Sequence, residues 1–199
     1  EMLAKRFGLG GRYFLFVGAG DRRKNLPRLL QAFALARVRG SADVQLALCG
    51  PKVPRGAAST SPGVHWLGRV SDQELRALYH AATALIQPSL LEGFGLPVLE
   101  AMASGTPVLS SSATSLPEVA GEAALFFDPT DVDAMSLTME RVLTDRPLVE
   151  GLRARGLVQA RHFRWEDTAR RTLAVFDEVR GRGPMRQASD APAGNIFPR

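Results

Sequence analysis

The sequence predicts an α/β fold in which a parallel sheet is covered by helices on both faces, and two observations carry this prediction. From Tyr13 onward, short apolar runs alternate with longer segments whose apolar residues recur at helical spacing. The short runs are almost wholly apolar, as parallel strands buried on both faces are. At 199 residues the chain is long enough for one compact domain and a tail.

Six strands are expected, a number that fits one Rossmann-like sheet. They are predicted at residues 13–17, 44–48, 64–67, 84–87, 107–110 and 124–127. The crossover helices between them are predicted at residues 26–37, 72–81 and 96–104. Ser71 and Glu74 form a capping pattern at the start of the second helix, and Gly105 ends the third.

The strand pattern stops after Pro129, and three further helices are predicted at residues 132–143, 147–162 and 166–179. We expect these helices to pack on the flank of the sheet. Residues 181–199 contain several Pro and Gly and show no periodic apolar pattern, so a flexible tail is predicted there.

Composition excludes several classes of protein. With 45% hydrophobic and 23% charged residues, the chain is close to an average globular protein and is neither disordered nor fibrous. No apolar run approaches the ~18 residues that span a bilayer, and the N-terminus lacks the apolar core of a signal peptide, so a cytoplasmic protein is expected. The single cysteine, Cys49, ends an apolar run and is expected to be buried. His and Cys residues nowhere show the spacing of a metal site.

The net charge of +5 is concentrated at the C-terminal end of the chain. Residues 1–140 contain 13 Lys and Arg against 13 Asp and Glu, whereas residues 141–199 contain 12 against 7. Two interpretations stay open. One is peripheral contact with an anionic surface at the inner membrane face, or with another acidic partner, and the other is ordinary solvated helix faces. No nucleic-acid partner is expected.

The most informative segment covers residues 88–108, where a strand, a glycine loop and a helix follow one another. Gly93 and Gly95 bracket Phe94, so the backbone there can approach a ligand closely. The amides around Gly95 and Leu96 belong to a helix N-terminus, which is a ready anion site and suits a diphosphate. Such sites lie beyond the carboxyl ends of parallel strands, where this loop is expected.

Two carboxylates flank this predicted anion site. Glu92 lies in the loop and Glu100 about one turn into the helix. Carboxylates accept hydrogen bonds from vicinal hydroxyls, so Glu100 suits a ribose and Glu92 a transferred sugar. Taken singly, each residue has a plainer interpretation: Glu100 as a helix glutamate near the positive end of the helix dipole, and Glu92 as an exposed loop glutamate. The spacing of the two residues and the neighbouring glycines together favour a binding site.

A second loop follows the first predicted strand and reads GAGDRRKN over residues 18–25. Its basic residues include Lys24, and as a group they are interpreted either as ligands of an anion or as a solvated cluster. Gly18 and Gly20 also resemble part of a dinucleotide fingerprint. Arg23 stands where the third glycine of that fingerprint belongs, and no acidic residue follows at the required distance, so NAD binding is not expected.

The spacing of Glu92 and Glu100, within the sequence EGFGLPVLEAMASGTPV, closely resembles the donor-site motif of family 4 (group 1) retaining glycosyltransferases with the GT-B fold. The similarity extends over roughly residues 11–180. It implies that residues 13–180 are the C-terminal, sugar-nucleotide-binding half of such an enzyme and that residues 1–12 are an interdomain segment. The N-terminal half, which binds the acceptor, is then missing from this chain.

The resemblance also implies roles for individual residues. Glu100 is expected to bind the ribose hydroxyls, Glu92 to contact the donor sugar, and Lys24 to neutralise the donor diphosphate without a metal ion. Backbone amides that contact the sugar and diphosphate are expected at Phe94, Gly95 and Leu96.

Members of this family commonly have an Arg directly after Gly18, where this chain has Ala19. Either Arg23 or Arg22 is then expected to supply the second positive charge, and Arg23 is favoured. The nucleobase is expected beside Gly50 and beside the loop that contains Arg69. The three histidines are expected to be structural.

The function implied is transfer of a hexose, with mannose as the favoured sugar, from a nucleoside-diphosphate sugar to a glycan or lipid-linked acceptor. This chain is expected to bind the donor and to transfer nothing alone. Two alternatives stay open. One is a sugar-nucleotide epimerase of similar architecture, and the other is a non-catalytic nucleotide-binding module, favoured if Ala19 reflects decay of the site.

Overall fold

The structure is a computed structural model that describes residues 6–51 and 61–181. The chain forms two compact units, Glu1–His162 and Phe163–Arg199. The predicted tail lies outside the described residues except for Gly181, as do residues 1–5 of the predicted interdomain segment. The predicted domain boundaries stay predictions.

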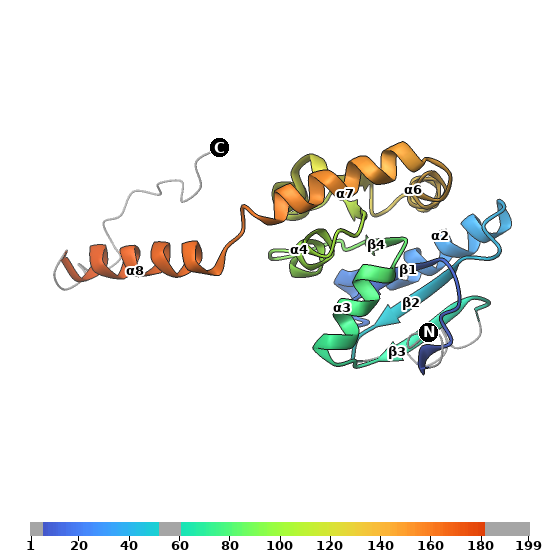
Figure 1. The fold of residues 1–199 in the computed structure, drawn as a ribbon, viewed down its shortest axis with the longest axis horizontal. Coiled ribbons are helices and arrows are strands. Elements are labelled where there is room, and N and C mark those ends of the chain that lie inside the picture. The colour runs from blue at the N-terminus through green and yellow to red at the C-terminus, as the bar shows by residue number, and fades with distance from the viewer. Residues whose placement is uncertain (1–5, 52–60, 182–199) are drawn as a thin grey trace. The chain divides into compact units, whose positions relative to one another are not determined.

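The first unit contains a six-stranded parallel sheet in the order β3-β2-β1-β4-β5-β6 (Figure 1). The strands are β1 Tyr13–Val17, β2 Gln45–Cys49, β3 Val64–Gly68, β4 Ala84–Gln87, β5 Val108–Ser111 and β6 Ala124–Phe127. The predicted fold class is therefore confirmed. All six predicted strands are present, and no boundary differs by more than one residue.

The point that matters for function is the boundary between β1 and β4, which pair directly, with Phe14 opposite Ala84. From β1 the chain passes to β2 on one side, and from β4 it passes to β5 on the other side. The strand order therefore reverses between β1 and β4. In open α/β sheets, ligands bind in the crevice outside the carboxyl ends of the strands at such a reversal.

Helices cover both faces of the sheet, as Figure 1 shows for the first unit. Their bounds are α2 Leu26–Val38, α3 Asp72–Ala81, α4 Leu96–Ala103, α5 Leu116–Ala120, α6 Val132–Thr144 and α7 Arg146–Ala160, with 3-10 turns η1 Arg22–Lys24 and η2 Gly121–Ala123. One apolar cluster joins α2 and α6 to one face, and a second joins α3, α4 and α5 to the other. Neighbouring residues of β1 alternate between them: Phe14 and Phe16 belong to the first cluster, and Tyr13 and Leu15 to the second.

Two helical details differ from the sequence prediction or extend it. The short helix α5 was not predicted, because five residues are too few to show a helical repeat. The capping box at the start of α3 is present, with Ser71 and Glu74 each bonding the backbone of the other.

The last three predicted helices are all present. Of these, α6 packs against α2 and β6, and α7 packs against α4, where Gly156 faces Met102. The third, α8 Trp165–Gly181, belongs to the second unit and buries none of its residues. The packing predicted for α8 stays a prediction. Within the described ranges, no helix combines the length and apolar character needed to cross a membrane.

Candidate functional site

The loop after β1 is fastened to the loop after β4. Asp21 caps η1 by accepting hydrogen bonds from the amides of Arg23 and Lys24. The amide of Leu90 donates to the carbonyl oxygen of Arg23 at 2.7 Å. Asn25, buried and left-handed at φ 57°, donates its side-chain amide to the carbonyl oxygen of Pro88 at 3.0 Å. These bonds hold the loop that carries Lys24 beside the loop that carries Glu92.

Lys24 and Glu92 form an ion pair between these two loops. The distance from Lys24 Nζ to Glu92 Oε1 is 2.6 Å, and the two side chains are 14% and 11% exposed. Gln87 Nε2 and Ser89 Oγ donate to the same carboxylate oxygen, at 2.6 and 2.7 Å. Three donors thus converge on one oxygen of Glu92.

The environment of Glu92 keeps it ionised. Burial alone would raise the pKa of its carboxyl group. The hydrogen bonds from Lys24, Ser89 and Gln87, together with the charge of Lys24, lower the pKa by more than burial raises it, so the pKa lies below its ordinary value. A glutamate with a lowered pKa contributes stability at neutral pH that is lost as the pH falls through that pKa. At neutral pH the site therefore holds an ionised Glu92 carboxylate beside Lys24.

The start of α4 lies directly after Glu92. Gly95 is left-handed at φ 104°, and a Cβ there would come within 2.7 Å of the Leu116 side chain. The first amides of a helix have no acceptor within the helix, so those of Gly95 and Leu96 are available to an anion. Ser115 Oγ donates to the carbonyl oxygens of Glu92 and Phe94 and fixes this loop.

Glu100 is held by a residue of another helix. The hydroxyl of Tyr79, on α3, donates to Glu100 Oε2 at 2.7 Å. Tyr79 is buried, whereas Glu100 is exposed. Burial and, to a smaller extent, the charge of Glu100 raise the pKa of Tyr79, so its hydroxyl stays protonated and acts as a donor. Glu100 therefore presents its carboxylate to solvent from a fixed position.

Gly18 and Gly50 bring the loops after β1 and β2 together. A Cβ on Gly50 would overlap the carbonyl oxygen of Gly18, and one on Gly18 would lie 3.2 Å from the Lys24 side chain. The three arginines that were predicted to bind the donor are not held in this region as Lys24 is. Arg23 pairs with Asp21 at 3.2 Å, and Arg22 and Arg69 are exposed. Their ligand roles, like the role of Gly50 at the nucleobase, stay predictions.

Sequence reasoning missed several side chains of this region, among them Tyr79, Gln87, Ser89, Thr114 and Ser115. In the sequence, Gln87 shows only as a polar residue that ends an otherwise apolar strand. Cys49 is buried, as expected. Among the described residues, no three His, Cys, Asp or Glu side chains are grouped so that they could hold a metal ion.

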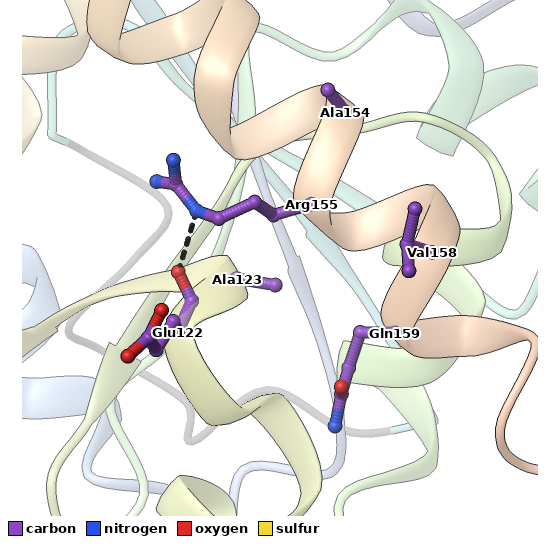
Figure 2. A pocket seen from close by; sticks show the side chains of 6 residues that line it. All are labelled: Glu122, Ala123, Ala154, Arg155, Val158 and Gln159. Atoms are coloured by element: carbon purple, nitrogen blue, oxygen red, sulfur yellow. Dashed lines mark hydrogen bonds between the residues drawn. The ribbon is translucent and has the colours of Figure 1, made fainter.

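A hollow of about 420 Å³ lies between α7 and the turn η2, which precedes the edge strand β6 (Figure 2). It is lined by Glu122, Ala123, Ala154, Arg155, Val158 and Gln159. Arg155 Nε donates to the carbonyl oxygen of Glu122 at 2.8 Å, and Gln159 donates to that of Val119. These polar groups hold α7 against the preceding segment, and the hollow contains no predicted site residue.

Comparison with known proteins decides the family. The profile of the family described as Glycosyl transferases group 1 matches residues 4–157, which is more than half of the chain. The chain belongs to the group 1 glycosyltransferases. The family predicted from the spacing of Glu92 and Glu100 is thereby confirmed.

This group 1 glycosyltransferase domain is similar to several mannosyltransferases. It is 42% identical over 175 residues to O-antigen chain mannosyltransferase B of Escherichia coli, covering 82% of this chain and 45% of that protein. It is 38% identical over 179 residues to the MMP alpha-(1->4)-mannosyltransferase of Mycolicibacterium hassiacum, covering 84% and 43%. The chain thus spans less than half of the length of either relative.

A solved structure resembles it in fold. Sucrose-phosphate synthase from Thermosynechococcus elongatus superposes with a TM-score of 0.75 at 27% identity, over 88% of this chain and 48% of that one. The domain has the Rossmann-like fold of one half of a GT-B glycosyltransferase.

Proposed function

We propose that a complete enzyme containing this chain transfers a hexose from a nucleoside-diphosphate sugar to a glycan or lipid-linked acceptor, and that this hexose is mannose. The transfer retains the anomeric configuration of the sugar. In this proposal the chain is the donor-binding half. The observation that carries it is the Lys24–Glu92 pair, which lies at the reversal of strand order and directly before the N-terminus of α4. The choice of mannose is supported by relatives that are named mannosyltransferases.

Each residue has a separate task. Lys24 and the amides of Gly95 and Leu96 stabilise the negative charge that grows on the diphosphate as the glycosidic bond breaks, and this electrostatic role needs no metal ion. Glu92 orients and electrostatically supports the sugar. Glu100 accepts hydrogen bonds from the ribose hydroxyls.

The acceptor binds outside this chain, in a part of the enzyme that the present sequence does not include. The excess of basic residues in 141–199 supports peripheral contact with an anionic membrane surface at the inner face. The isolated chain consequently binds the donor but transfers nothing.

Titration calorimetry with GDP-, UDP-, ADP- and dTDP-sugars tests the proposal and identifies the nucleobase. Saturable binding of one of them supports a donor-binding half. If none binds, the chain is a module without donor function. An epimerised nucleotide, formed by the full-length enzyme incubated with donor alone, would instead indicate an epimerase.

Removing the Glu100 carboxylate weakens nucleotide binding. We expect the Glu100→Ala variant to bind the nucleoside diphosphate about 10- to 100-fold more weakly, because hydrogen bonds to a charged group contribute about 1.5–3 kcal/mol. Glu118→Ala is the matched control, since Glu118 is also an exposed helix glutamate, on α5. Equal affinities for both variants in calorimetry would reject the ribose role of Glu100.

A further inference from the structure

The two oxygens of Glu92 are in different situations. Oε1 accepts hydrogen bonds from Lys24, Gln87 and Ser89, at 2.6 to 2.7 Å. Across residues 6–51 and 61–181, the structure shows no hydrogen bond to Oε2. One oxygen is therefore saturated with donors, and the other is available to a ligand.

Gln87 donates a hydrogen bond to Glu92, but its own side-chain oxygen is left buried without a hydrogen bond in the described part of the chain. Its side chain is fully buried, and Nε2 donates both to Glu92 Oε1 and to Ser89 Oγ, the latter at 2.9 Å. Its own Oε1 is buried and has no hydrogen-bond partner in the described part of the chain. Turning the amide over would set that oxygen against the Glu92 carboxylate, which has no proton to donate. A buried carbonyl oxygen without a partner destabilises a fold, so the stability of β4 does not explain this residue.

Ser89 completes the arrangement. Its hydroxyl accepts from Gln87 and donates to Glu92 Oε1, so the three side chains form a closed set of hydrogen bonds. Ser89 is itself buried, and its carbonyl oxygen accepts from Ser111 Oγ at 2.6 Å. The loop backbone at this position is therefore fixed by the neighbouring strand β5.

We infer that Gln87 and Ser89 are positioning residues that hold Oε1 of Glu92, so that Oε2 faces the transferred sugar of a bound donor. This inference rests on the proposed role of Glu92. It also explains how Lys24 serves two partners. When the ammonium turns toward the diphosphate, Glu92 keeps two neutral donors on Oε1 and is not left as a buried charge without compensation.

If Gln87 and Ser89 position Glu92, their substitution should weaken binding of the sugar part of the donor and leave binding of the nucleoside diphosphate almost unchanged. Gln87→Met keeps the length of the side chain but removes both hydrogen bonds. We expect this variant to bind the nucleoside-diphosphate sugar about tenfold more weakly, while its affinity for the nucleoside diphosphate alone changes less than about twofold. Urea unfolding should show unchanged or greater stability, because the unpaired carbonyl oxygen is lost. Ser89→Ala should show the same pattern of binding.

Gln45 provides a matched control. It lies on β2 of the same sheet, and among the described residues its buried Oε1 likewise has no hydrogen-bond partner. Its Nε2, however, donates to the carbonyl oxygen of Gly8, away from Glu92. Gln45→Met should leave both affinities unchanged. In a Glu92→Ala background, Gln87→Met should have no further effect on binding of the sugar nucleotide, because Gln87 acts through Glu92.

Each outcome decides something different. Equal losses for the diphosphate and its sugar conjugate, or an added loss in the Glu92→Ala background, would overturn the positioning role alone. If the wild type binds neither ligand, the proposed function fails and the positioning role fails with it.

Discussion

We expect the Lys24→Met variant to bind nucleoside diphosphates about 100-fold more weakly than the wild type, a loss of about 2.7 kcal/mol. The Lys24 side chain is 14% exposed, and its Nζ lies 2.6 Å from Oε1 of Glu92, which stands in the loop before α4. Methionine keeps the length of the side chain, which packs on Gly18, but removes the charge. It also leaves the Glu92 carboxylate without its counter-ion. Titration calorimetry measures the effect.

Arg141→Met is the control for Lys24→Met. It removes the same charge at an exposed position in the last turn of α6, outside the loops of the site. We expect it to change the affinity less than about threefold, because exposed charges are screened by solvent and salt. A folded Lys24→Met protein that binds diphosphate as well as Arg141→Met would show that Lys24 does not contact the donor.

Gly50→Ala is expected to lower the free energy of unfolding by about 3 kcal/mol. Gly50 has φ 155°, and an added Cβ would overlap the backbone carbonyl oxygen of Gly18. A backbone atom cannot turn aside as a side chain can, so the loops after β1 and β2 would have to separate. That separation displaces the loop that carries Lys24. Urea unfolding measures the loss of stability.

Gly40→Ala is the control that distinguishes the strain of a left-handed backbone from the overlap of an added Cβ with a neighbouring atom. Gly40 has φ 116° but open space around its Cβ position, so its substitution costs only the left-handed backbone, about 1–2 kcal/mol. If Gly50→Ala is no more destabilising than Gly40→Ala, the two loops do not approach each other closely.

Much of the fold could be predicted because buried parallel strands leave a strong signal. The strands at 13–17, 84–87 and 124–127 have the predicted bounds. The second strand was predicted to begin at residue 44, but it begins at Gln45. The prediction included Val44 because this residue is as apolar and as buried as a strand residue, although it lies just before the strand. Apolar patterning reports burial, whereas the limits of a strand depend on hydrogen bonds that it does not reveal.

The site was less predictable, because its contacts depend on strand order. Lys24 and Glu92 were each predicted to face the donor, but they are 68 residues apart, and their direct contact follows from the pairing of β1 with β4. Tyr79 reaches Glu100 only because α3 packs beside α4. Gln87 and Ser89 were missed since, in sequence, polar residues at the end of a strand indicate only that the strand stops.

The most direct test of a donor site at the carboxyl ends of β1 and β4 is a map of amide chemical-shift changes during titration with a nucleoside-diphosphate sugar. The largest changes should fall in residues 18–25 and 92–100. Changes centred on the hollow that contains Glu122 and Arg155, or no changes at saturating ligand, would contradict the account.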